Sequence, residues 1–147
     1  MINSLSPFSL QSTRVPLPAM RLVAYRGKHD DNFQGNEKAT LLAEALNKAV
    51  GRILTNRKSP SRRVNEIDNR ATNFYVALYW AEYLAETDPA FRPIFEQLSS
   101  NRSQIVDEFK SSQNVSVDLG GYYLFDHDKT KKAMLPSSTL NAIVDSA

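Results

Sequence analysis

The sequence predicts a mostly α fold: a compact helical domain with three main helices, a short strand and a short C-terminal helix. Apolar residues recur at helical spacing along three stretches, at about residues 36–55, 69–87 and 89–110. Each stretch begins with a residue that favours a helix start, either a side-chain cap or a proline. Apolar and polar residues alternate at residues 115–119, which predicts the strand.

The composition is that of one soluble globular domain. The chain has 147 residues, of which 41% are hydrophobic and 23% charged, and it carries a net charge of +2. This charge is too small to indicate nucleic acid as a partner. The absence of cysteine excludes disulfides and thiol catalysis and fits a reducing cytoplasm. No run approaches the roughly 18 apolar residues of a membrane span, and the N-terminal residues do not resemble a signal peptide. We therefore expect a cytoplasmic protein with neither membrane nor nucleic acid as a partner.

Two regions differ in character. Residues 1–34 form a divergent N-terminal arm, with four serines and three prolines in the first 18 residues. Residues 35–147 form the helical domain. Asn36 is a suitable cap for its first helix, which extends to about Thr55. The apolar stripe of this helix comprises Ala39, Leu42, Ala45 or Leu46, Ala49 and Ile53.

The next helix is apolar almost all round and is expected in the middle of the fold. Asp68 or Asn69 caps it, and residues 87–89 end it. One stripe comprises Phe74, Ala77, Leu78, Ala81, Leu84 and Ala85, and a second comprises Tyr75, Tyr79 and Tyr83. A polar, cationic loop precedes this helix, and the helix start should attract anions through its free N–H groups and its dipole.

The remaining elements are shorter. Asp88 and Pro89 begin a helix that keeps one apolar face to about residue 110, with a possible break at residues 99–101. The strand at residues 115–119 follows, and Gly120-Gly121 permits a tight bend. A short helix is expected at residues 126–134. Pro136 ends it, and Ser137 or Ser138 caps a last turn over residues 140–144.

Several polar groups have both a functional and a structural interpretation. The cationic stretch at residues 57–63 is a polyanion patch, a phosphorylation site or a solvated loop. Glu66 and Asp68 suggest an acid–base pair or a metal site, but no histidine lies nearby and capping accounts for Asp68 more simply. Arg63 and Arg70 are expected to pair with these carboxylates or with a helix end.

The same comparison applies to the other candidates. Asp126-His-Asp128 and His29-Asp-Asp31 suggest fragments of metal sites, but three adjacent residues rarely converge on one ion, and a helix cap explains the first set better. The tyrosine stripe suggests base stacking or, at helical spacing, core packing. Gly120-Gly121 lacks the following helix cap that a phosphate-binding loop needs.

Five blocks of sequence resemble the C-terminal end of the monomeric NADP-dependent isocitrate dehydrogenases, in the order of that family. The blocks are Ser59-Pro-Ser-Arg-Arg-Val, Glu66-Ile-Asp-Asn-Arg70, Phe74-Tyr-Val-Ala-Leu-Tyr-Trp-Ala81, Val117-Asp-Leu-Gly-Gly-Tyr-Tyr123 and Met134-Leu-Pro-Ser-Ser-Thr-Leu-Asn-Ala142. The resemblance begins at about Gly35. It implies that this helical segment belongs to a larger α/β domain of a tricarboxylic acid cycle enzyme.

The resemblance carries over one site residue. It implies that Arg62 contacts the 2′-phosphate of NADP, with Ser61 and Arg63 as further cofactor-binding candidates. It supplies no catalytic residue, because the substrate, Mg or Mn and proton-transfer groups of the family lie mostly upstream. We therefore expect a truncated or stand-alone homologue that binds NADP weakly and is inactive alone.

The partner follows from the same comparison. An apolar face that the rest of the enzyme would cover predicts a homo-oligomer, most simply a dimer, or a complementary polypeptide. The alternative is a non-enzymatic helical module for binding or oligomerisation, with a phosphorylated ligand or a protein as its partner.

Overall fold

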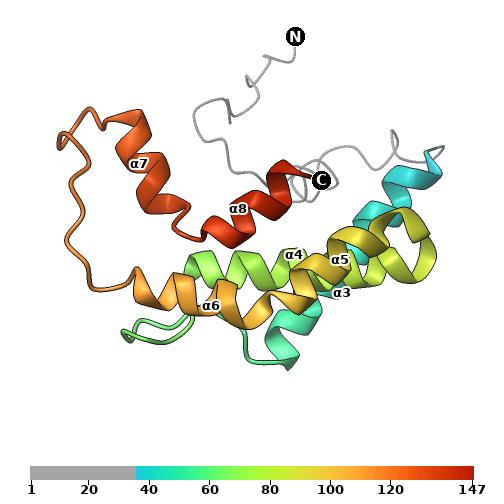
Figure 1. Ribbon diagram of the computed structural model, residues 1–147. Helices are drawn as coiled ribbons and strands as arrows, with labels where there is room; N and C mark the ends of the chain where they lie inside the picture. The colour runs from blue at the N-terminus through green and yellow to red at the C-terminus, as the bar shows by residue number, and fades with distance from the viewer. Residues whose placement is uncertain (1–35) are drawn as a thin grey trace, which may run out of the picture.

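The computed structural model describes residues 36–147, which form helices arranged around one central helix (Figure 1). The elements are α3 (Glu37–Thr55), α4 (Asn69–Thr87), the short 3₁₀ helix η1 (Pro89–Phe91), α5 (Arg92–Ser100), α6 (Arg102–Ser111), α7 (His127–Met134) and α8 (Ser138–Asp145). The prediction of a mostly α fold is confirmed. The predicted N-terminal arm, residues 1–34, lies outside the described residues.

The helices begin where their capping side chains predicted. The Asn36 side chain accepts the Ala39 N–H at 3.1 Å and starts α3. The Asp68 carboxylate accepts the Ala71 N–H at 2.9 Å and starts α4. Both bonds satisfy backbone donors that a helix leaves without a partner in its first turn. The third apolar stretch is divided at Asn101 into α5 and α6, so the predicted break is also confirmed.

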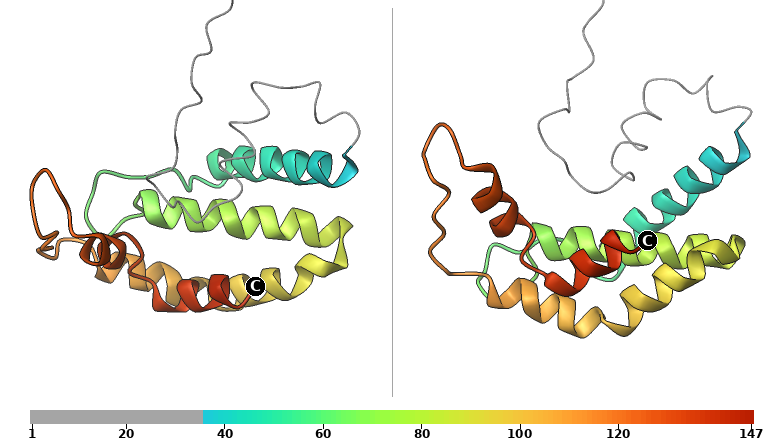
Figure 2. Two further views of the ribbon diagram at one scale, coloured as in Figure 1. Left: turned by 90° about the horizontal axis from the view of Figure 1, so that it is seen from above. Right: turned by 45° about the horizontal axis from the view of Figure 1, so that its top comes forward.

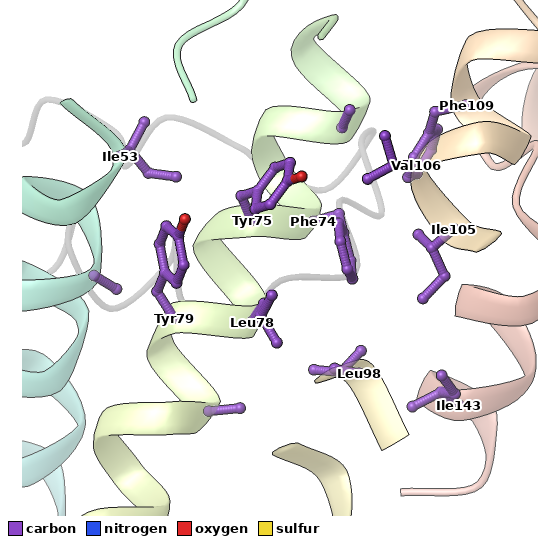
Figure 3. Packing of buried hydrophobic residues seen from close by; sticks show 13 residues of the cluster. Ile53, Phe74, Tyr75, Leu78, Tyr79, Leu98, Ile105, Val106, Phe109 and Ile143 are labelled. Atoms are coloured by element: carbon purple, nitrogen blue, oxygen red, sulfur yellow. The ribbon is translucent and has the colours of Figure 1, made fainter. Parts of the chain in front are cut away.

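Helix α4 lies between α3 on one side and α5 with α6 on the other (Figure 2). Its two apolar stripes pack against these two neighbours. Tyr75 and Tyr79 lie on the side of α3, whereas Phe74 and Leu78 face the residues of α5, α6 and α8 (Figure 3). Phe74 is 1% exposed and Tyr79 is 6% exposed. A helix that is apolar almost all round is therefore buried in the middle of the fold, as the sequence predicted.

Polar groups fix the contact between α3 and α4. The Trp80 indole N–H donates to the carbonyl oxygen of Leu42 at 3.0 Å. Arg52 forms an ion pair with Glu82 at 2.7 Å, and its guanidinium lies 4.5 Å from the ring centre of Tyr79. The tyrosine stripe is thus packing surface, covered in part by a cation, which confirms the packing interpretation over base stacking.

Helix α8 is held against α6 by the carboxylate of Glu108. Its oxygens accept the hydroxyls of Ser137 and Thr139, both at 2.6 Å, and the side-chain N–H of Gln104 at 3.1 Å. Ser137 is 1% exposed and also caps α8 by accepting the Leu140 N–H. Burial raises the pKa of Glu108, but these hydrogen bonds outweigh it and hold the pKa below its ordinary value.

The predicted strand at residues 115–119 is wrong. In the described part of the chain this segment belongs to the long connection between α6 and α7, and no β-strand is present. The physical reason is the lack of a partner, because a strand exists only when another strand satisfies its backbone groups. The predicted helices on either side of it, α6 and α7, are both present.

Candidate functional site

The cationic loop, residues 57–68, connects α3 to α4 and is fixed at its start. The Lys58 N–H donates to the carbonyl oxygen of Ile53 at 2.8 Å, which ties the loop to the end of α3. The Lys58 carbonyl accepts the hydroxyl of Thr72 at 2.8 Å, which ties the same residue to α4. The Lys58 ammonium lies 4.8 Å from the ring centre of Tyr75. The start of the loop is therefore held by both helices.

Ser61 closes the loop into a narrow turn. Its backbone N–H donates to the carbonyl oxygen of Ile67 at 2.7 Å. Its hydroxyl donates to the Glu66 carboxylate and accepts the Arg63 N–H at 3.2 Å. The Ser61 oxygen is thus already engaged in holding the turn. Its predicted contact with NADP stays a prediction.

Gln113, just beyond the end of α6, anchors the outer part of the cationic loop. Its side-chain carbonyl accepts the Asn65 N–H at 2.8 Å, and its amide N–H donates to the Glu66 carbonyl at 2.8 Å. Asn65 has a φ of 66°, a left-handed conformation that asparagine adopts more readily than most residues. Sequence reasoning missed Gln113, because nothing local marks a contact across 48 residues.

Arg62 lies at the outside of this fixed loop and is exposed. Its guanidinium makes no hydrogen bond or ion pair with another residue in the range 36–147, and the same holds for Arg57 and Arg63. The expected pairing of Arg63 with a carboxylate is therefore not among the contacts of the described residues. A phosphate needs donors of this kind that are presented by a fixed backbone.

The start of α4 differs from the expectation of a free anion site. The Asp68 carboxylate occupies the capping position and is bound by Arg70, whose Nη2 lies 2.7 Å from the carboxylate oxygen. Arg70 also donates to the carbonyl oxygen of Ala133 at 3.0 Å, next to the end of α7. A carboxylate of the same chain thus fills the helix end, and an added phosphate would meet its negative charge. The exposed guanidinium groups of the loop carry no such carboxylate in the described part of the chain.

The other candidate groups have structural roles. Asp68 caps α4 and Asp126 caps α7 by accepting the Lys129 N–H at 2.9 Å, as the capping interpretations predicted. Within residues 36–147, no three acidic or histidine side chains are arranged to share a metal ion. The set at residues 29–31 lies outside the described residues. None of the helices described here is long and apolar enough to cross a membrane.

Comparison with known proteins agrees with the sequence blocks. The family described as monomeric isocitrate dehydrogenase matches residues 23–145. The isocitrate dehydrogenase [NADP] of Azotobacter vinelandii is 46% identical over 121 residues, which cover 78% of this chain and 16% of that protein. Isocitrate dehydrogenase [NADP] 2 of Mycobacterium tuberculosis is 44% identical over 117 residues, which cover 76% of this chain and 16% of that protein. The corresponding protein of Colwellia maris is 41% identical over 116 residues, covering 75% of this chain and 16% of its own length.

The chain therefore spans about one sixth of the length of these relatives. The match includes the cationic loop and all the helices from α3 to α8. The chain belongs to the monomeric isocitrate dehydrogenase family.

Proposed function

We propose that this chain supplies the C-terminal part of an NADP-dependent isocitrate dehydrogenase and that Arg62 contacts the 2′-phosphate of NADP. The parent reaction converts isocitrate and NADP to 2-oxoglutarate, CO₂ and NADPH. The observation that carries the proposal is the cationic loop, whose backbone is held by contacts with α3, α4 and Gln113 while its arginines are exposed and pair with no residue in the range 36–147. Support also comes from the names of the relatives, which specify NADP.

The expected strength of this contact argues against activity of the chain alone. One hydrogen bond to a charged group contributes roughly 1.5–3 kcal/mol. Even millimolar affinity requires about 4 kcal/mol. Arg62 therefore selects the phosphate but does not hold the whole cofactor. Arg63 can add charge on the same turn, and Ser61 keeps the turn closed.

The described residues also do not fit a catalytic metal, because they bring no three suitable ligands together. The Mg or Mn of the parent family would be held by other parts of such an enzyme. The contribution of this segment is a rigid scaffold that positions a cationic loop.

The proposal is tested by NMR titration of the ¹⁵N-labelled protein with NADP and, in parallel, with NAD at millimolar concentration. We expect NADP to shift the amide signals of the cationic loop more than NAD does, because only NADP carries the 2′-phosphate. Arg62→Ala should remove this difference, whereas Arg102→Ala, an exposed arginine on α6, should preserve it. Equal shifts with both nucleotides, or an unchanged response in Arg62→Ala, would refute the contact.

A second measurement addresses the predicted inactivity. The purified chain mixed with isocitrate, NADP and Mg²⁺ should form no NADPH. Sustained NADPH formation would show that the chain contains the catalytic groups that we assign to the rest of the enzyme.

The second candidate function is a non-enzymatic module for protein contacts or oligomerisation. The observation that favours it is a group of large hydrophobic side chains exposed between α6 and α7, among them Tyr122 and Tyr123. It predicts a dimer, which light scattering distinguishes from a monomer. The two candidates differ in their ligand response, because this module requires no discrimination between NADP and NAD.

A further inference from the structure

The connection between α6 and α7 presents an unusual apolar surface. We call residues 114–126 the arm, as distinct from the predicted N-terminal arm of residues 1–34. In Figure 1 it runs from the end of α6 to α7, away from α3. Tyr123 and Leu124 are each 89% exposed. The exposed large hydrophobic residues of the arm are Val115, Val117, Tyr122, Tyr123, Leu124 and Phe125. Single exposed apolar residues are ordinary, but six within eleven positions are typical of a contact surface.

The backbone hydrogen bonding of the arm is also incomplete. Residues 115–119 carry the alternating pattern of a strand, with Val115, Val117 and Leu119 on one side. Among the described residues, the backbone of residues 115–118 makes no hydrogen bond with another backbone group. A segment with strand periodicity and free N–H and C=O groups is a template for pairing with another strand.

The arm nevertheless has a defined shape at its turn. Asp118 accepts the Gly120 N–H at 2.8 Å and forms an ion pair with Lys129 of α7. These two contacts lower the pKa of the Asp118 carboxyl. The Asp126 N–H donates to the Leu119 carbonyl at 2.7 Å, and Gly120 has a φ of 80°, where a side chain would be strained. A preformed turn reduces the entropy that binding must overcome.

We propose that the arm is the docking element for the polypeptide that carries the rest of an isocitrate dehydrogenase chain, with residues 115–119 adding a strand to a sheet edge of that partner. The apolar side chains of residues 122–125 pack against it. This inference rests on the proposed function. The arm lies inside the region that matches the family. In the relatives, the matched segment makes up about one sixth of the length of one chain.

A second copy of this chain would pair with the arm less stably than a partner that contains a sheet. Two arms paired with each other would form a two-stranded ribbon, and such a ribbon is marginally stable in water. A partner that already has a sheet supplies further strands and a covered face for Val115 and Val117. The arrangement therefore favours the larger partner over self-association.

The test uses the Azotobacter vinelandii relative, expressed without the C-terminal region that matches this chain and co-expressed with the full 147-residue chain. We expect a one-to-one complex to co-purify. Val117→Asp should weaken it by about tenfold or more, because a carboxylate would enter the apolar side of the added strand. Ser116→Asp is the matched control, since it adds the same charge on the opposite side. Failure of the wild-type pair to co-purify, or equal effects of the two variants, would overturn the proposal.

Amide hydrogen exchange gives a second readout, and its measurement on this chain alone does not require the truncated relative. In this chain alone, the amides of residues 115–118 should exchange rapidly at every protein concentration, and they should become protected in the complex. Protection in the chain alone would overturn the proposal. If that protection increased with concentration together with a dimer mass, the occupant would be a second copy; if it did not, another segment of this chain would cover the arm.

The two proposals fail in different ways. A complex whose NADP affinity is unchanged by Arg62→Ala would refute the phosphate contact and leave the docking role of the arm intact. A chain that discriminates NADP from NAD through Arg62 but forms no complex would do the reverse.

Discussion

Ser137→Ala tests the link between the C-terminal helix and the rest of the fold. The Ser137 hydroxyl has two roles: it donates to the Glu108 carboxylate at 2.6 Å, and it accepts the Leu140 N–H at 3.0 Å to cap α8. The residue is 1% exposed, so water cannot replace either bond without a rearrangement. Removing the hydroxyl therefore affects one helix start and one carboxylate together.

The expected loss follows from these two bonds. Loss of an N-cap costs about 1 kcal/mol, and loss of a hydrogen bond to a charged group costs roughly 1.5–3 kcal/mol. Glu108 keeps its bonds from Thr139 and Gln104, so we expect the unfolding free energy to fall by roughly 2–4 kcal/mol.

Urea denaturation followed by circular dichroism measures this change, and Ser138→Ala is the matched control. Ser138 is the exposed first residue of α8, and its replacement should change the unfolding free energy by less than about 0.5 kcal/mol. If the two alanine variants were equally stable, the Ser137–Glu108 contact would not hold α8 in place.

Three further predictions concern other parts of the fold. Because the pKa of Glu108 is lowered in the folded state, its contribution to stability is present above the ordinary glutamate pKa and is lost as the pH falls through the folded value. In urea denaturation, the stability difference between wild type and Glu108→Gln should stay constant down to about pH 5 and shrink below it; a constant difference at all pH values would contradict this. Gln113→Ala should accelerate amide exchange of the Asn65 N–H about five- to tenfold, while Gln97→Ala, an exposed side chain on α5, should not. Gly51→Ala should raise the unfolding free energy by about 0.5–1 kcal/mol, since no atom obstructs the added methyl group in α3; a lower urea midpoint would contradict this.

The sequence predicted the features of the fold that depend on neighbouring residues. Asn36, Asp68, Asp126 and Ser137 were each assigned as caps or cap candidates, and each accepts an N–H at its helix start. The apolar residues almost all round α4 likewise predicted its central position. These signals are visible in one sequence because a cap and a helical stripe span only a few residues.

The errors and omissions concern partners that are distant in the chain or not in it. Residues 115–119 have the pattern of a strand, but a pattern cannot supply the neighbouring strand. The contact between Gln113 and Asn65 joins residues 48 positions apart, and the contact between Glu108 and Ser137 joins residues 29 positions apart. For the site, the resemblance predicted Arg62, which stays a prediction, whereas the closure of the helix start by Asp68 and Arg70 required the folded geometry.

Gln113 links the cationic loop to the arm. Its side chain holds Asn65 and Glu66 of the loop, and the next residue, Asn114, begins the arm in a left-handed conformation with a φ of 56°. A partner bound to the arm would therefore restrain the residue adjacent to the anchor of the loop that carries Arg62. Local opening of this anchor costs only the two hydrogen bonds that Gln113 makes, because Asn65 and Glu66 are themselves exposed. Docking of the arm would thus reduce the entropy that the loop loses when it meets a phosphate, and it gives a physical reason to expect the proposed Arg62–phosphate contact to be stronger when the arm is docked than in the segment alone.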